Sequence, residues 1–356
     1  MKRIIISLFA LAGALSAMSV ARASGIAVTA PIADVPGEET ASGKKDYHMK
    51  KSCRTQTFLG KQTDCSLFYK KVGEQIDEVS SAQGASYKTL GHHGPAVENL
   101  QMALRLYFND SGAIDVYNKR QDGLELAAWK WYPSAEQQKA GAGCDEYYVG
   151  KTFGLGGIAI MDNGELIRPM ASGERLARCG KTRNGCYAEI ISKAIQLSDG
   201  PVDLTLRIEV KDGSRWAVVK AEASRPVIFA TGVNFPTGAD VIAGNSLISV
   251  WGVHPADVSS NPKPIGAALR YNSRRFDGPF RDSNQIRIVS KKCRKIQTEV
   301  FSASAEQVQA FVRDIEVKGL EKGEAVLPSA GELEKAEGQP SAGDWNNYLD
   351  YKSRVF

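Results

Sequence analysis

The segment LRLYFNDSGAIDVYNK, residues 104–119, decides the fold class. Apolar and polar side chains alternate on both sides of a short Asn-Asp-Ser-Gly turn at residues 109–112. Because successive side chains of a strand point to opposite faces, this period of two predicts an antiparallel hairpin. One face of the hairpin is apolar and suits a core. The other face carries five polar or aromatic side chains, which are Arg105, Tyr107, Asp115, Tyr117 and Lys119.

The same alternation recurs along the chain. Residues 204–221, LTLRIEVKDGSRWAVVKA, repeat the order of strand, turn and strand. Further strand-like runs cover residues 188–195, 227–233, 246–253, 266–271 and 285–289. Only residues 303–315 have helical periodicity, with Ser304 as the predicted N-cap. Many short strands and few helices predict an all-β fold, a large antiparallel β-sandwich.

The two ends of the chain differ in composition from its middle. Residues 1–23 have the three-part layout of a Sec signal, which predicts cleavage after Ala23 and a periplasmic or secreted protein. An uncleaved N-terminal anchor is the alternative. Residues 24–45 are expected to form a flexible leader, residues 46–327 the β-sandwich domain, and residues 328–356 a linker with an aromatic tail.

Charge and cysteine content narrow the class of protein further. The chain has 45 basic and 40 acidic side chains, and the predicted cleavage removes three of the basic ones, which argues against a general nucleic-acid binder. Six cysteines in an exported chain favour disulfides over a zinc site, because no C-x-x-C occurs. The spacing suggests three pairs among several possible connectivities: Cys179 with Cys186, Cys53 with Cys65, and Cys144 with Cys293.

The polar face of the first hairpin is the main candidate for a functional site. Cross-strand neighbours lie about 5 Å apart, so its cations, carboxylate and phenols gather closely. Aromatic faces combined with charged hydrogen-bonding groups suit a sugar ring, especially an anionic one. The alternative is a solvated outer face with ordinary ion pairs, which contribute little.

Two neighbouring motifs extend this candidate site. In GHHGPAVEN, residues 91–99, His93 could serve as a general acid or base with Glu98 as its partner. A turn with one buried and one exposed histidine is the alternative. In CDEYYVGKTFGLGG, residues 144–157, Asp145 and Tyr147 could line a ligand. The glycines fit neither a P-loop nor a complete dinucleotide fingerprint, and we expect them to permit tight strand packing or close approach to a ligand.

Four of these motifs together resemble a known family. They are HHGPAVEN (residues 92–99), RLYF (105–108), IDVYNK (114–119) and VGKTFGLG (149–156). They resemble a family of secreted bacterial proteins that carries a domain of unknown function and is commonly encoded in polysaccharide-utilisation gene clusters. The resemblance covers roughly residues 91–315. It implies a galactose-mutarotase-like β-sandwich and a carbohydrate setting, without implying a reaction.

These observations lead to three hypotheses for an exported protein that meets poly- or oligosaccharides. A glycoside hydrolase would draw two carboxyls from Glu98, Asp115 and Asp145. A polysaccharide lyase would neutralise a uronate with Arg105 or Lys119 and abstract its proton with Tyr117 or His93. A non-catalytic carbohydrate-binding protein would use the same face without turnover. We place the hydrolase first.

The predicted residues divide by role. The predicted catalytic residues are His93, Glu98, Asp115 and Tyr117, and the predicted substrate-binding residues are His92, Arg105, Tyr107, Lys119, Asp145 and Tyr147. The expected partner is a carbohydrate, either neutral or anionic. We expect no cofactor, no metal ion, no nucleic acid and no membrane anchor.

Overall fold

The computed structural model describes residues 62–82, 85–126, 133–170, 172–255, 259, 261–318 and 339–354. Only the backbone is described for residues 85–86, 314–318 and 351–354. The chain divides into two units, residues 1–56 and 57–356, and every described residue belongs to the second. The predicted signal and leader, residues 1–45, and Cys53 therefore lie outside the described residues.

A small antiparallel sheet contains the hairpin that opened the sequence analysis. Its order is β1-β3-β4-β5. The four strands are β1 (Thr63–Ser66), β3 (Ala96–Asn99), β4 (Ala103–Leu106) and β5 (Ile114–Tyr117). In the β4–β5 register Leu104 lies opposite Val116 and Arg105 lies opposite Asp115, as the alternation predicted.

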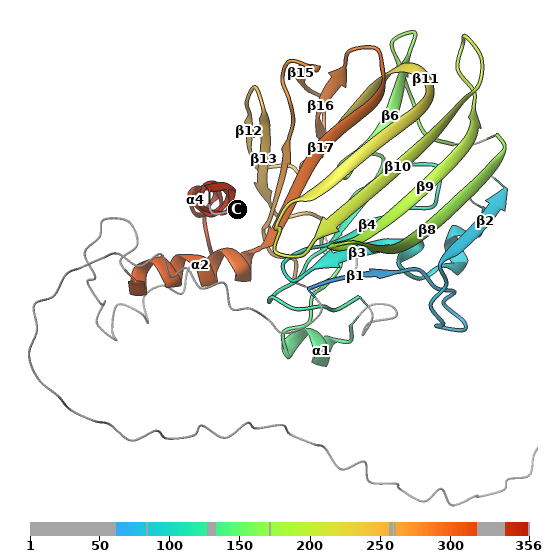
Figure 1. Ribbon diagram of the computed structural model, residues 1–356. Coiled ribbons are helices and arrows are strands. Elements are labelled where there is room, and N and C mark those ends of the chain that lie inside the picture. The colour runs from blue at the N-terminus through green and yellow to red at the C-terminus, as the bar shows by residue number, and fades with distance from the viewer. Residues whose placement is uncertain are drawn as a thin grey trace, which may run out of the picture. The chain divides into compact units, whose positions relative to one another are not determined.

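A large sheet of 13 strands packs against the small one. Its main path is β12-β13-β14-β17-β11-β10-β9-β8-β2, and β6, β7, β15 and β16 join it through the far half of β11. The strands are β2 (Glu78–Ala82), β6 (Leu155–Asp162), β7 (Glu165–Ile167), β8 (Glu174–Thr182), β9 (Gly185–Ile195), β10 (Val202–Lys211), β11 (Ala217–Asn234), β12 (Asp240–Ala243), β13 (Leu247–Gly252), β14 (Ile265–Arg270), β15 (Phe276–Arg281), β16 (Gln285–Ser290) and β17 (Cys293–Ser304). Figure 1 shows β1, β3 and β4 lying across one side of β8, β9 and β10.

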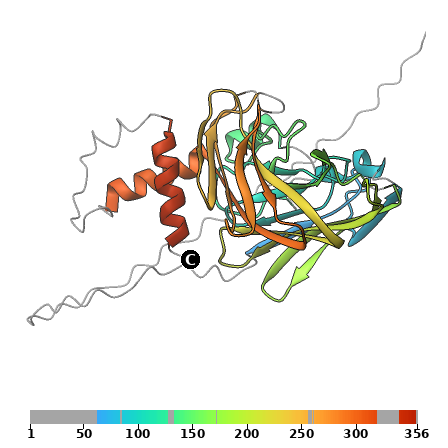
Figure 2. The same cartoon turned by 90° about the horizontal axis from the view of Figure 1, so that it is seen from above.

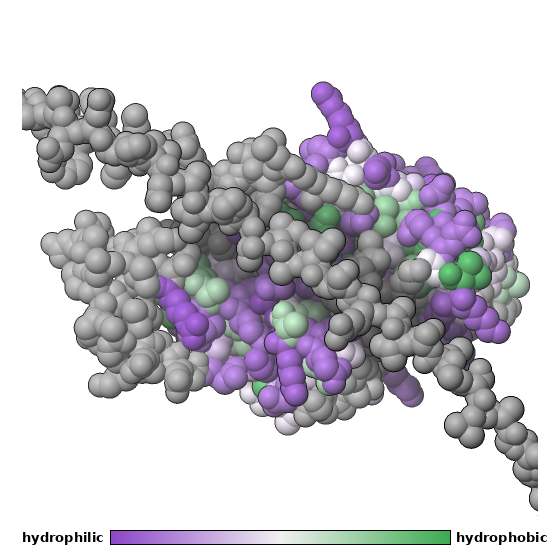
Figure 3. Space-filling model, turned by 90° about the horizontal axis from the view of Figure 1, so that it is seen from below, coloured by the Kyte–Doolittle hydropathy of each residue, from purple (hydrophilic) through white to green (hydrophobic). Residues whose placement is uncertain are grey.

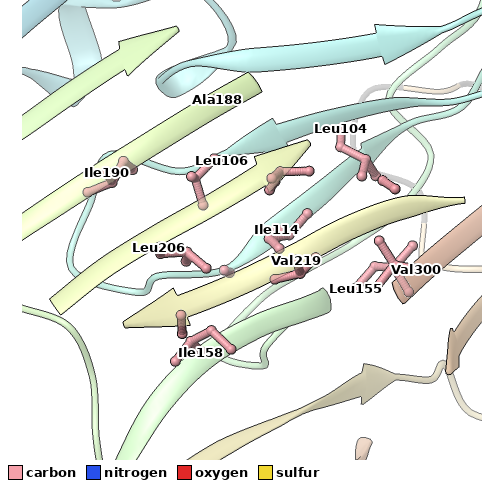
Figure 4. Packing of buried hydrophobic residues seen from close by; sticks show 14 of the residues in the cluster. Leu104, Leu106, Ile114, Leu155, Ile158, Ala188, Ile190, Leu206, Val219 and Val300 are labelled. Atoms are coloured by element: carbon pink, nitrogen blue, oxygen red, sulfur yellow. The ribbon is translucent and has the colours of Figure 1, made fainter. Parts of the chain in front are cut away.

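The core fills the space between the two sheets. Leu104, Leu106 and Ile114 of the small sheet are fully buried and point toward side chains of β9, β10 and β11, among them Ile190 and Leu206 (Figure 4). Each such aliphatic side chain contributes about 1.5–3 kcal/mol when it leaves water. The apolar face of the hairpin is therefore the face that joins the two sheets.

The described residues also form helices beside the sheets. They are η1 (Ala85–Thr89), η2 (Gly91–His93), α1 (Ala135–Lys139), α2 (Ala305–Lys318) and α4 (Ala342–Arg354). The predicted cap of α2 is confirmed, because Ser304 Oγ accepts the Gln307 N–H at 3.2 Å and the Gln307 side chain accepts the Ser304 N–H at 3.0 Å.

The aromatic tail docks on the domain through α4. Trp345 is 1% exposed and stacks 5.8 Å from Phe301 and 6.0 Å from Trp251. Gly266 of β14 makes room for the indole, since a Cβ there would meet it at 2.3 Å. Figure 2 shows α4 crossing α2 beside the orange strands of the large sheet.

The predicted fold class is confirmed, with two antiparallel sheets, both predicted hairpins and few helices. The described part of the chain has no helix that is long and apolar enough to cross a membrane. The surface in Figure 3 is mainly hydrophilic where it is coloured, with small separate hydrophobic patches.

The predicted cysteine pairs are wrong for the described residues, because Cys65, Cys144, Cys179, Cys186 and Cys293 form no disulfide with one another. In the β8–β9 register Cys179 faces Ala188 while Cys186 faces Lys181, so the two cysteines are diagonal neighbours. Diagonal Cα atoms lie about 7–8 Å apart, which exceeds the usual span of a disulfide. Cys144 bridges to Asn118, whereas Cys293 pairs with Val227 in the large sheet.

Candidate functional site

The polar face of the first hairpin is buried. Arg105, Asp115, Tyr117 and Lys119 are each at most 1% exposed. The face is therefore not the solvated outer face that the sequence allowed as an alternative. Buried charges must be paired to remain in a protein interior. On this face the pairs form two groups.

The first group, here called the Arg105 group, consists of Arg105, Tyr107, Asp115 and Asp145. Arg105 Nη2 forms an ion pair with Asp115 Oδ2 and a second one with Asp145 Oδ2 at 2.6 Å. The Tyr107 hydroxyl donates to Asp115 Oδ2 at 2.7 Å. Asp115 is completely buried, whereas Asp145 retains 8% exposure and Tyr107 is half-buried. The group therefore reaches from the interior toward the surface.

Burial raises the pKa of Asp115 to about 7, and the Asp145 carboxylate adds to the rise while Arg105 opposes it. Burial and the adjacent Asp115 also raise the pKa of Tyr107 well above its ordinary value. Tyr107 therefore remains a hydroxyl donor at neutral pH and is a poor proton acceptor.

His93 lies at the surface edge of the Arg105 group. Its ring packs edge-on against Tyr107, with centroids 5.7 Å apart, and against Tyr87 at 5.9 Å. Burial lowers the pKa of His93, and Lys70 and Arg105 lower it further, whereas Asp145 acts in the opposite direction. At neutral pH the imidazole is therefore uncharged and able to accept a proton.

The two adjacent histidines occupy a tight turn. His92 and His93 both have left-handed backbone conformations, with φ of 54° and 59°. Such angles are uncommon outside glycine and are found at constrained functional segments. Gly94 completes the turn with φ of 156°, and a Cβ there would lie 2.2 Å from the Leu106 carbonyl oxygen. The turn is therefore held directly against β4.

The turn buries His92 and leaves His93 half-buried, whereas the alternative interpretation of this motif expected one buried and one exposed histidine. His92 packs edge-on against Phe68 at 5.4 Å, and burial lowers its pKa to about 3. Its Nε2 atom is buried without a hydrogen-bond partner. His92 is therefore an uncharged interior side chain rather than a surface ligand.

Tyr147 is buried beside His254. Its hydroxyl is buried without a hydrogen-bond partner, and its ring lies 4.4 Å from that of His254. Burial and the nearby Asp115 raise the pKa of Tyr147 well above its usual value. The next residue, Tyr148, is 49% exposed. The sequence therefore places one tyrosine in the interior and its neighbour on the surface.

The second group, here called the Lys119 group, contains Glu98, Tyr117, Lys119 and Glu125. Lys119 Nζ pairs with Glu98 at 2.5 Å and also donates to the backbone carbonyls of Asn99 and Gly123. Glu98 accepts the backbone N–H groups of Glu125 and Leu126 at 2.8 and 2.9 Å. The Tyr117 hydroxyl donates to Glu125 Oε2 at 3.0 Å.

These bonds bind the segment at residues 123–126 to the sheet. Three of the predicted site residues, Glu98, Tyr117 and Lys119, therefore belong to an interior network with backbone partners. The structure does bring Tyr107, Asp115 and Asp145 together around Arg105, with His93 against Tyr107. Glu98, the proposed partner of His93, contacts Lys119 and the backbone of residues 125–126.

The glycines of residues 154–157 serve close strand packing. Gly154 has φ of 64°, and a Cβ there would lie 1.9 Å from the Ile114 carbonyl oxygen. Ile114 belongs to β5, beside Asp115. This segment therefore packs closely against the strand that carries Asp115. Tight strand packing is one of the two roles that the sequence predicted for these glycines.

Sequence reasoning missed Glu125, Tyr87 and a role for His254. Glu125 accepts bonds from Tyr117 and from the Gly143 N–H at 2.8 Å, yet it stands in an irregular stretch with no motif. Tyr87 and His254 contact the site only through the tertiary fold. Among the described residues no group of three or more His, Cys, Asp or Glu is placed to hold a metal ion.

Comparison with known families shows to which protein family this chain belongs. Residues 39–299 match the family described as Domain of unknown function (DUF4861). The chain belongs to this family. The DUF4861 match includes both the hairpin and the two histidines, and so confirms that the motifs belong to a family domain. No curated protein matches the sequence.

The solved structures with a distant likeness to this DUF4861 protein include two that, by their names, act on carbohydrates. One is a 4-alpha-glucanotransferase from Thermococcus litoralis, with 11% identity, a TM-score of 0.29, and coverage of 59% of this chain and 39% of that chain. The other is a putative aldose 1-epimerase from Klebsiella pneumoniae, with 9% identity, a TM-score of 0.30, and coverage of 74% of this chain and 97% of that chain. This chain thus spans well under half of the glucanotransferase. At these scores neither likeness bears on the site.

Proposed function

We propose that this protein is a carbohydrate-active enzyme that hydrolyses a glycosidic bond at the Arg105 group. The observation that carries the proposal is the pairing of a buried and a more exposed carboxylate on one guanidinium nitrogen, next to a half-buried histidine. Groups with different burial and different protonation are the usual basis of acid–base catalysis.

In this proposal Asp145 and His93 are the groups that touch the sugar. Asp145 is the carboxylate nearest to the surface, and Arg105 orients it. The uncharged His93 accepts a proton from the attacking water, whose oxygen bonds to the anomeric carbon. As the glycosidic C–O bond breaks, the carboxyl group of Asp145 passes a proton to the leaving oxygen, and transfer of the proton held by His93 restores the starting state. Arg105, Asp115 and Tyr107 are positioning residues. Arg105 contacts Asp145 and Tyr107 contacts His93, while Asp115 holds both Arg105 and Tyr107.

The contacts of the cations favour hydrolysis over elimination. A lyase needs a positive group that is available to neutralise the uronate carboxylate. Arg105 already serves two carboxylates, and Lys119 serves Glu98 and two backbone carbonyls. Burial and the adjacent Glu125 also raise the pKa of Tyr117, the tyrosine that the lyase hypothesis uses as its base, so it is a poor proton acceptor. The exposed Tyr148 offers an aromatic face on which a sugar ring could stack.

The test is a screen of the purified full chain against neutral and uronate-containing poly- and oligosaccharides. Hydrolysis releases reducing ends without forming an unsaturated sugar that absorbs ultraviolet light. Asp145→Asn and His93→Ala should abolish this release, whereas Asp277→Asn, which alters an exposed carboxylate, should retain it. Ultraviolet-absorbing products would establish a lyase, and binding without any product would establish a binding protein. Either result would overturn the proposal.

The proposal includes export, which brings the site to external glycans. It rests on the signal-like layout of residues 1–23 and on the carbohydrate setting that the family resemblance implies. Cell fractionation and N-terminal sequencing test it. A mature chain that begins at Ser24 outside the cytoplasm is expected, and an intact N-terminus on a cytoplasmic protein would contradict it.

A further inference from the structure

Three cysteines that lie far apart in the sequence meet where the two sheets join. Cys65 is on β1 of the small sheet, while Cys179 and Cys186 are on β8 and β9 of the large sheet. The Cys65 side chain is within hydrogen-bond reach of both other thiols. Cys186 Sγ also lies 2.8 Å from the carbonyl oxygen of Asp64, the residue that precedes Cys65.

The strand register explains why Cys65 occupies the central position. Cys179 and Cys186 are diagonal neighbours on the same face of the β8–β9 pair, and that face points toward the small sheet. A disulfide between diagonal neighbours would need backbone movement. Cys65 approaches from the opposite sheet and contacts both thiols, so the geometric obstacle does not apply to it.

We propose that Cys65 is an oxidisable hub that forms a disulfide with either Cys186 or Cys179 and so links the small sheet to the large one. The proposal is independent of the carbohydrate chemistry at the Arg105 group. It replaces the local pairing of Cys179 with Cys186 that the sequence suggested. Because Cys65 can serve only one partner at a time, the third cysteine remains a thiol that can exchange with the bond.

The reaction requires an oxidant of the disulfide class, such as glutathione disulfide. Two S–H bonds break and one S–S bond forms, while two electrons and two protons pass to the oxidant, which leaves as two molecules of reduced glutathione. A cavity of about 200 Å³ lined by Asp64, Lys181 and Cys186 lies beside the thiols. It gives a small disulfide a route to this cluster.

The environment of the thiols predicts slow exchange at neutral pH. Hydrogen bonding with Cys65 and burial raise the pKa of Cys179 and of Cys186 above the usual value for a thiol. Only the thiolate attacks a disulfide. Oxidation should therefore accelerate as the pH increases above neutrality.

The test oxidises the reduced full chain with glutathione disulfide and maps its disulfides by mass spectrometry without reduction. The expected product contains Cys65 linked to Cys186 or to Cys179. In Cys65→Ser both of these partners should stay available to an alkylating reagent. In Cys186→Ser the link should shift to Cys179, which keeps the proposal testable if the first variant fails to fold. Cys144→Ser, which alters a cysteine outside the cluster, should behave as the unmodified chain.

Thermal unfolding supplies a second measurement. The bond closes a long loop, so reduction should lower the Tm of the oxidised chain by about 5 °C or more and leave that of Cys65→Ser unchanged. A Cys179–Cys186 link, a Cys53–Cys65 link, or a Cys65 thiol that persists after oxidation would each overturn the proposal.

Discussion

The Arg105 group and the Lys119 group lie on the same buried sheet face, but their contacts differ. Lys119 has one carboxylate partner, Glu98, and backbone carbonyls take its other bonds. Arg105 has two carboxylate partners, and one of them, Asp145, acts to raise the pKa of the half-buried His93. Backbone partners hold a buried network in one conformation. Two carboxylates that share one cation and differ in burial are instead typical of a site with acid–base chemistry.

The comparison shows that residue type alone does not distinguish structure from function. Both groups contain a cation, carboxylates and a tyrosine, and all arise from one hairpin and its neighbours. Their difference lies in the partners supplied by other segments, which are backbone amides at residues 125–126 in one case and Asp145 in the other.

The largest expected effect is a loss of stability when the cation of the Lys119 group is removed. Lys119→Met leaves Glu98 charged and unpaired in the interior, so the free energy of unfolding should fall by about 3–5 kcal/mol. Urea titration followed by circular dichroism measures the loss. As a control, Lys193→Met removes an exposed partner of Asp203 and should change stability by less than about 1 kcal/mol. Equal losses in the two variants would show that the Lys119 group does not stabilise the fold.

The second effect is on the hydrolytic rate, which should depend on the Arg105 group and not on the Lys119 group. Asp145→Asn should lower the hydrolytic rate by about a hundredfold or more while the chain remains folded, because it removes a proposed acid–base group. Glu98→Gln retains the shape of the side chain, and its carboxamide oxygen can accept one of the two backbone N–H groups that the two carboxylate oxygens accept. The folded fraction of this variant should keep its activity. Rates normalised to folded protein measure the contrast, and an inactive but folded Glu98→Gln would reverse the assignment.

The local features of the fold could be predicted from the sequence. The alternation of residues 104–119 predicted the β4–β5 hairpin and its apolar face, and Ser304 predicted the start of α2. These features depend on neighbours within a few residues. The docking of Trp345 against Phe301 depends on a segment more than forty residues away, so the sequence showed only that the tail is aromatic.

The candidate site could be predicted only in part, for the same reason. The alternation placed Arg105 and Asp115 side by side, and the structure agrees. It could not show that residues 123–126 cover the Lys119 end of that face, since no motif marks Glu125. Pairing cysteines by spacing failed because the contact that matters, between Cys65 and the β8–β9 pair, crosses from one sheet to the other.

The third effect concerns pH and stability. The folded-state pKa of Asp115 is raised to about 7, above the value of about 4 in an unfolded chain. Between these values the folded state binds more protons, so the free energy of unfolding should fall as pH increases, by up to about 1.4 kcal/mol per pH unit. Urea titrations between pH 4 and pH 7 measure the slope in the unmodified chain and in Asp115→Asn. The variant should lose this contribution, and an unchanged slope would show that Asp115 does not titrate in that range.

The smallest effect compares two matched hydroxyl deletions. Tyr107→Phe and Tyr117→Phe each remove one hydrogen bond to a carboxylate, at 2.7 Å and 3.0 Å, and each should cost about 1–3 kcal/mol of stability. Only Tyr107→Phe should alter catalysis, because its bond to Asp115 supports the Arg105 group and its ring packs against His93. We expect a lower kcat and a displaced pH profile for this variant, with an unchanged profile for Tyr117→Phe. If both variants displaced the profile alike, the two groups would act as one network, and the separation between structural and catalytic pairs would be lost.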